Sequence, residues 1–135
     1  MRGLLSIALA LAVSFSLVSF PLEGQDSETY AEEYDLYQKI EAETDSTKRR
    51  ELIFEFLETF KASVLDPNVS YLYAQYYSGP RQRSQWQQLA DLAEVYLRRR
   101  PNDGTAIAAA TEAYQKLGNT QKLVDFGSKL YNDSP

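Results

Sequence analysis

The sequence predicts an all-α fold in which about six helices form antiparallel hairpins, stacked one after another as a short α-solenoid. Three observations predict this fold. Apolar residues recur at spacings of three and four along the chain after residue 26, and no segment alternates for long enough to form a strand. Pro101 and Pro135 lie 34 residues apart, which is the length of one helical hairpin. We place this helical domain at residues 25–135.

The N-terminal segment has the pattern of a secretory signal. Arg2 is followed by an uncharged run from Leu4 to Phe20 and then by an acidic stretch that begins at Glu23. We predict that residues 1–24 are a cleaved signal peptide with Gly24 as its last residue. The alternative is an uncleaved signal anchor, because the run approaches the ~20 residues of a membrane-spanning helix. Cleavage gives a periplasmic or secreted protein, and retention gives an inner-membrane anchor with the domain outside the cytoplasm.

The chain contains neither cysteine nor histidine. Disulfides and a lipid-modified cysteine are thereby excluded, so an exported domain of this kind is stabilised by its core alone, as is typical of a bacterial envelope protein. The usual general base near neutral pH, the thiol nucleophile and most transition-metal ligands are missing too. With no glycine-rich phosphate loop and no nucleophile elbow, we predict a protein that is not an enzyme, without catalytic residues, cofactor or metal.

The net charge of -5 argues against a nucleic-acid partner. The charge is uneven, because the stretch from Glu23 to Asp45 contains nine acidic residues and a single basic one, Lys39. The basic residues gather later, notably at residues 48–50 and 98–100. Two interpretations stay open: adjacent helices of opposite charge, or a polarised surface on which the acidic first helix selects the partner.

The first helix is expected from Ser27 to Glu43, with a tyrosine stripe along one side. The polar break at residues 44–47 precedes the second helix, whose apolar residues cover a broad face that we expect to be buried. The stripe of the first helix is Tyr30, Tyr34, Tyr37 and Glu41, and the apolar face of the second is Leu52, Ile53, Phe56, Leu57 and Phe60.

A short third helix is expected to begin at Asp66-Pro67, with Asp66 as the cap and Pro67 in the first turn. We expect it to end at Ser78-Gly79-Pro80, since glycine favours the left-handed cap and proline interrupts the hydrogen-bond ladder.

The fourth helix is predicted to open at Ser84, with Gln87 three residues later as its capping-box partner. Three arginines at 98–100 suit the negative pole at its end, before Pro101.

The fifth helix follows residues 102–104 and is rich in alanine, which lets a neighbouring helix approach closely. Gly118-Asn119 is predicted to form the turn before the sixth helix. When the fourth helix is aligned with the sixth at an offset of 34 residues, each aligned pair consists of two residues of similar type. The pairs are Leu89 with Leu123, Ala90 with Val124, Ala93 with Gly127, Tyr96 with Leu130, and Leu97 with Tyr131.

The segment Gly104–Pro135 resembles a tetratricopeptide repeat. The matching features are Tyr114 in the first helix of the pair, the turn at residues 118–119, and the terminal Pro135. Residues 110–111 replace the family's leucine-glycine pair, and Gly127 stands where an aromatic residue is usual. The resemblance therefore covers the motif only at about 104–135, and the architecture from Tyr30 onward.

In this family the first helix of each pair lines a concave groove, so the resemblance implies where a partner would bind. Ten tyrosines are present, and four of them crowd the third helix, where they cannot all face one core. Each either fills a gap between helices or reaches the surface, where tyrosine is enriched at binding sites. The groove candidates are Tyr71, Ser78, Thr105, Ala108, Glu112, Gln115 and Lys116.

The sequence thus predicts an exported protein–protein interaction scaffold that binds a peptide or protein segment. One alternative is a membrane-anchored assembly subunit with a retained N-terminal helix, and another is a carbohydrate-binding helical module that uses tyrosines as stacking platforms. Contact with a membrane is expected only through the N-terminal segment. The array stops at Pro135 without a further polar helix, so either the chain is a fragment or its last apolar face meets a partner or a second copy.

Overall fold

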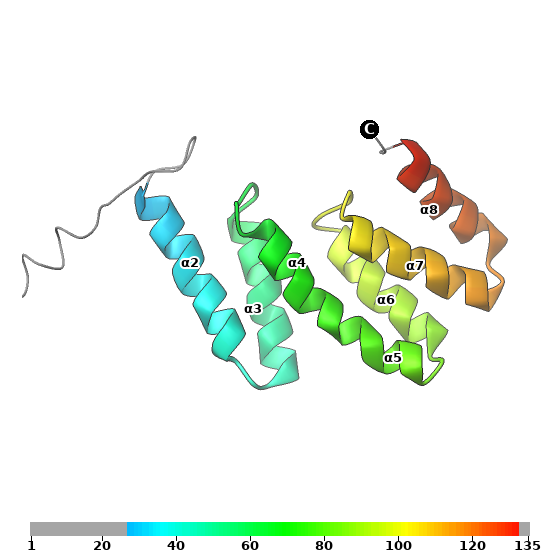
Figure 1. Ribbon diagram of the computed structural model, residues 1–135, viewed down its shortest axis with the longest axis horizontal. Helices are drawn as coiled ribbons and strands as arrows, with labels where there is room; N and C mark the ends of the chain where they lie inside the picture. Colours follow the sequence, from blue (N-terminus) through cyan, green and yellow to red (C-terminus); the bar gives the residue numbers. More distant parts are fainter. Residues whose placement is uncertain (1–26, 133–135) are drawn as a thin grey trace, which may run out of the picture.

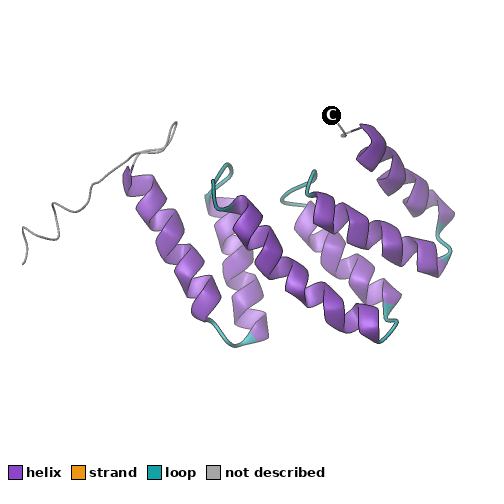
Figure 2. Ribbon diagram, in the orientation of Figure 1, coloured by secondary structure: helices purple, strands orange, loops and turns teal. Residues whose placement is uncertain are grey.

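The computed structural model describes residues 27–132, and side chains from residue 28 to 128. These residues form an all-helical structure without strands, which confirms the predicted all-α class (Figure 2). The elements are α2 (Ser27–Ala42), α3 (Ser46–Thr59), α4 (Asp66–Ala74), a 3₁₀ turn η1 (Gln75–Tyr77), α5 (Ser78–Gln82), α6 (Trp86–Leu97), α7 (Gly104–Leu117) and α8 (Thr120–Asn132). The predicted signal segment and Pro135 lie outside the described residues. None of the described helices is long and apolar enough to cross a membrane.

Successive helices run in opposite directions and form three hairpins (Figure 1). α2 pairs with α3, the continuous segment α4–η1–α5 pairs with α6, and α7 pairs with α8. The first helices of the hairpins also lie alongside one another. The Ser70 hydroxyl of α4 donates to Asp103 at the start of α7 over 2.8 Å, and Arg81 of α5 pairs with Glu112 of α7 at 2.9 Å. We call the exposed side of α2, α4–η1–α5 and α7 the first-helix face.

The third helix does not end where the sequence predicts. It continues through η1 and α5 as far as Gln82, so the predicted stop at Ser78-Gly79-Pro80 is wrong. Pro80 is the third residue of α5, and the first N–H groups of a helix have no partner within it, so the missing N–H removes no bond. Gly79 has no positive φ, and among the described residues only Ser84 and Gly118 do.

Ser84 ends a helix instead of starting one. Its φ is +55°, its N–H donates to the Arg81 carbonyl, and the next N–H, of Gln85, donates to the Pro80 carbonyl over 2.8 Å. This pair of bonds is the Schellman cap of α5. Gln85 is the N-cap of α6 and has no side-chain capping bond, so the predicted capping box of Ser84 and Gln87 is wrong.

The N-cap of α4 likewise differs from the prediction. Leu65 occupies the cap position without a side-chain bond, and Asp66 is the first helical residue. Pro67 lies in the first turn, as predicted. The carboxylate of Asp66 is directed toward Arg100, which lies after α6.

The core has an aromatic part and an alanine part. Tyr73 is the centre of the aromatic part, with its ring centroid 4.8 Å from that of Tyr96 and 5.6 Å from that of Phe54. Its hydroxyl donates to the Leu92 carbonyl over 2.7 Å. The alanine part lies in α6 and α7, where the small side chains are at most 2% exposed, as the sequence predicts for closely packed helices. These are Ala90, Ala93, Ala106, Ala109, Ala110 and Ala113.

The turn after α7 confirms its prediction. Gly118 has a φ of +70°, and the N–H of Asn119 donates to the Tyr114 carbonyl over 3.0 Å while that of Gly118 donates to Gln115. This is the same Schellman cap that ends α5, here with the glycine that such a position favours.

Candidate functional site

The predicted groove residues lie on two neighbouring first helices. Tyr71 and Ser78 are two turns apart along α4–η1–α5. Thr105, Ala108, Glu112 and Gln115 of α7 follow one another at spacings of three and four, which places them in one stripe with Lys116 at its edge. Tyr71 is 69% exposed, the largest exposure among the large hydrophobic side chains of the described residues. Ser78, Thr105, Ala108, Gln115 and Lys116 are exposed as well, and Glu112 is half-buried.

Two of the predicted residues have partners on another helix. Glu112 pairs with Arg81 and thus joins α7 to α5, with both side chains partly exposed. The ammonium of Lys116 lies 5.5 Å from the centre of the Trp86 ring, at the start of α6. Glu112 therefore holds the face together, and Lys116 is directed toward a second helix instead of extending the stripe.

Two tyrosines of α2 belong to the same face and were not among the predicted site residues. Tyr34 is 42% exposed and stacks on Tyr30 with ring centroids 6.1 Å apart. Burial raises the pKa of Tyr37, as does its hydrogen bond to Glu41, while a hydrogen bond to Asn68 of α4 lowers it. This contact with Asn68 places the tyrosine stripe of α2 beside α4, three residues before Tyr71. The tyrosine spacing in α2 was the available sequence signal, but only the packing of α2 on α4 identifies the shared face.

The exposed charge of the first helices is concentrated on α2. Its exposed carboxylates outnumber its one exposed ammonium group, which belongs to Lys39. The exposed acidic residues are Glu28, Glu32, Asp35 and Glu41. By helical periodicity Glu41 lies in the stripe of the tyrosines, whereas the other three lie on the opposite flank of α2. α7 carries one acidic side chain, Glu112, and that carboxylate is already paired.

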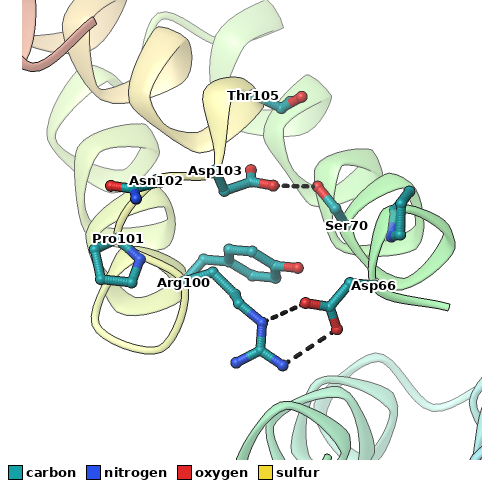
Figure 3. Close-up of a pocket in the computed structure, with 9 residues that line it drawn as sticks. Asp66, Ser70, Arg100, Pro101, Asn102, Asp103 and Thr105 are labelled. Carbon is teal, nitrogen blue, oxygen red and sulfur yellow. Dashed lines mark hydrogen bonds and ion pairs between the residues drawn. The ribbon is translucent and has the colours of Figure 1, made fainter. Parts of the chain in front are cut away.

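A hollow of about 540 Å³ lies between the starts of α4 and α7 and the loop after α6 (Figure 3). Arg100 projects into it and holds the Asp66 carboxylate as a fork, with Nε 2.5 Å from Oδ2 and Nη2 3.1 Å from Oδ1. Asp103 accepts a hydrogen bond from Ser70 and caps α7 by accepting the N–H of Ala106 over 2.9 Å. Both carboxylates in the hollow are thus engaged.

Arg100 also reaches the end of another helix. Its Nη1 donates to the Leu57 carbonyl over 3.1 Å and to the Arg99 carbonyl over 3.0 Å, and its Nη2 donates to the Phe60 carbonyl over 2.8 Å. Each of the five guanidinium N–H groups therefore has an acceptor. The predicted role of this arginine at the end of its own helix is replaced by one at the end of α3. The polar groups in the hollow form hydrogen bonds and an ion pair with one another, so we interpret the hollow as a structural contact between helices.

The described residues contain no group of three acidic side chains that could hold a metal ion. Burial raises the pKa of Tyr77, Tyr96 and Tyr114, and Tyr114 also donates its hydroxyl to Glu94. Protonated phenols in a packed interior are poor nucleophiles and bases.

The chain matches no family model, no curated protein and no solved structure.

Proposed function

We propose that the chain is an exported, tetratricopeptide-like scaffold that binds an extended peptide or protein segment along the first-helix face. The observation that carries the proposal is the exposure of Tyr71 at 69%, while Tyr73 and Tyr77 on the same helical segment are buried. The core contacts of this helical segment are made by other residues, so the exposed ring is available to a partner. Tyrosine offers such a partner a large contact area and a polar tip.

The solenoid part of this proposal is supported by the order of the hairpins and by the sequence period. The first helices of the three hairpins lie side by side, so their exposed stripes form one continuous surface (Figure 1). Such a surface suits a segment that crosses several helices, because each hairpin contributes one or two contacts. Export is supported by the signal-like residues 1–24.

The charge of the face favours a partner segment with basic residues. Where the segment passes α2 it meets the rings of Tyr34 and Tyr37 and, one turn beyond Tyr37, the exposed carboxylate of Glu41. A lysine or arginine side chain can pair with this carboxylate and lie over the rings. Where it passes α7 it meets Thr105 and Ala108, which are small and uncharged. We therefore expect the basic residues at the end of the segment that contacts α2.

Site-specific photo-crosslinking in cells that produce the full chain tests the proposal. A photoreactive amino acid replaces Tyr71 in one variant and Ala108 in a second. In the control variant it replaces Glu55, which is exposed on α3 and outside the first-helix face. We expect Tyr71 and Ala108 to crosslink to the same polypeptide and Glu55 not to. Mass spectrometry of the crosslinked peptide then shows whether its residues near α2 are basic.

Two results would overturn the proposal. Equal crosslinking from Glu55 would show that the face has no special role. The absence of any polypeptide at Tyr71, combined with glycan binding that Tyr71→Ala abolishes, would replace the scaffold with a carbohydrate-binding module.

A further inference from the structure

A second hollow lies between the start of α3, η1–α5 and α6, with a volume of about 320 Å³, and neither Tyr34, Tyr37 nor Tyr71 lines it. We call it the Arg50 pocket. Its lining carries two guanidinium groups and several neutral hydrogen-bonding side chains, and it contains no carboxylate. The polar lining residues are Ser46, Arg50, Gln75, Tyr76, Arg83 and Gln88.

Arg50 is the unusual member of this lining. Its Nε is buried and has no hydrogen-bond partner, and it is the one buried side-chain nitrogen or oxygen in this state among the described residues. Its Cζ lies 5.5 Å from the centre of the Tyr76 ring, and no carboxylate of the described residues forms an ion pair with it. Arg100, which has an acceptor for every donor, shows how the chain satisfies a guanidinium elsewhere. A buried N–H group without an acceptor is costly, and an acceptor in the pocket that reaches Nε removes that cost.

Arg83 supplies a second cation from the end of α5. Its guanidinium lies against the backbone of Gly79, where an added Cβ would come within 3.3 Å of Nη2. Its Nε donates to the Gln85 side chain over 2.9 Å. The next residue is Ser84, whose positive φ turns the chain sharply at this point. The glycine and the turn together allow the arginine to lie along the pocket wall.

We propose that the Arg50 pocket binds one oxyanion group, such as a phosphate or a carboxylate, between Arg50 and Arg83. Guanidinium N–H groups match the oxygens of such an anion in geometry and charge. Gln75, Gln88 and Ser46 add neutral donors. Arg50 also lines an adjoining hollow that contains Asp91, whose carboxylate accepts a hydrogen bond from Gln87. This inference does not depend on the proposed scaffold function, because the pocket lies apart from the tyrosines of the first-helix face.

The test is a titration of the full chain with inorganic phosphate and, separately, with acetate, against sodium chloride at matched ionic strength. NMR follows the guanidinium signal of Arg50 and the amide signals of Gln75 and Gln88. We expect saturable shifts with phosphate, acetate or both, and none of this kind with chloride. Tighter binding of phosphate assigns the pocket to phosphate groups, and tighter binding of acetate assigns it to carboxylates. Shifts that grow linearly without saturation, or equal shifts with chloride, overturn the proposal.

Variants locate the binding. Arg50→Met is expected to weaken the affinity for the tighter-binding anion by roughly tenfold or more, because a charge-assisted contact is lost. The matched control is Arg98→Met, which removes an exposed arginine at the end of α6 outside the pocket, and the affinity should stay unchanged. An equal loss in both variants would mean that net charge alone attracts the anion. Arg83→Met is a second variant at an exposed position, and it should also weaken binding; unchanged affinity there contradicts the two-arginine site.

Discussion

The two junctions between neighbouring hairpins are built differently. Where the first hairpin meets the second, Arg100 connects Asp66 to the last carbonyls of α3, and Arg99 pairs with Glu58 while its Cζ lies 4.4 Å from the centre of the Phe54 ring. Where the second hairpin meets the third, buried alanines let α6 and α7 pack closely. Arginine contacts and the packing of Tyr73 on Phe54 thus dominate the first junction. Close alanine packing dominates the second, which also has the polar contacts of Asp103 and Glu112 described above. The three hairpins are therefore joined in two different ways, which should respond differently to mutation.

Arg100→Met should have the largest effect, a loss of about 2–4 kcal/mol in the free energy of unfolding. The change leaves the Asp66 carboxylate and the Leu57 and Phe60 carbonyls without their donor. Urea unfolding followed by circular dichroism measures it. The exposed neighbour provides the control, and Arg98→Met should stay within about 0.5 kcal/mol of the parent chain.

Hydrogen exchange sharpens this prediction by locating the loss. Amide exchange in α2 and α3 should accelerate more than exchange in α6 and α7, because the first junction is the one weakened. Uniform acceleration across all helices would contradict the view that the two junctions are independent.

Ala110→Leu tests the second junction and should cost about 1–3 kcal/mol, because the fully buried site has no room for three more carbon atoms. Ala108→Leu makes the same change at an exposed position of the same helix, and both residues are good helix formers. The difference in unfolding free energy between the two variants measures the packing alone. Equal stability of the two variants would show that α6 and α7 are loosely packed.

The first junction should also weaken at alkaline pH. Burial raises the pKa of Tyr73 from 10.0 to about 12, so the folded chain keeps this proton where the unfolded chain loses it. The resulting stability is present below pH 10 and is lost as the pH rises from 10.0 toward about 12. The urea midpoint, measured along this range, should fall.

Tyr73→Phe separates this tyrosine from its neighbours. At neutral pH the variant should lose about 0.5–1.5 kcal/mol, since the bond to the Leu92 carbonyl is gone. Its urea midpoint should fall less steeply above pH 10.0 than that of the parent chain. An unchanged slope would assign the alkaline loss to other groups.

The smallest predicted effect is a gain. Ser84→Gly should raise the unfolding free energy by about 0.5–1 kcal/mol, because a left-handed backbone is strained for serine and not for glycine. The reciprocal change, Gly118→Ser, should lower it by a similar amount. An added Cβ at Gly118 meets no atom within 4 Å, so that loss reflects the backbone alone. Calorimetry of both variants checks the pair, and shifts of the same sign would contradict it.

Local patterns predicted the second junction much better than the first. The alanines of α7 and the turn at Gly118 follow from composition and from the needs of a left-handed cap, so they could be predicted without a structure. The bonds of Arg100 could not, because its partners lie 34 residues away at Asp66 and 43 residues away at Leu57. The arginines at 98–100 were assigned to their own helix because that is the only helix the local sequence shows.

The wrong helix stop before α5 was likewise predicted from the local sequence alone. Glycine and proline at residues 79–80 are common helix stops, but a 3₁₀ turn before them allows Pro80 to begin a new helical turn. On the candidate site, Tyr71 was predicted because four tyrosines cannot share one core. Tyr34 and Tyr37 were missed as site residues, because their place beside α4 depends on how the first hairpin packs.

The bonds from Arg100 to the Leu57 and Phe60 carbonyls have a consequence for the shape of the proposed binding surface. A planar guanidinium offers its donors in fixed directions, so it limits how far the first hairpin can rotate against the second. That rotation sets the span between Tyr34 on α2 and Tyr71 on α4. A residue that makes no hydrogen bond to either tyrosine would thus determine the curvature that the proposed segment follows.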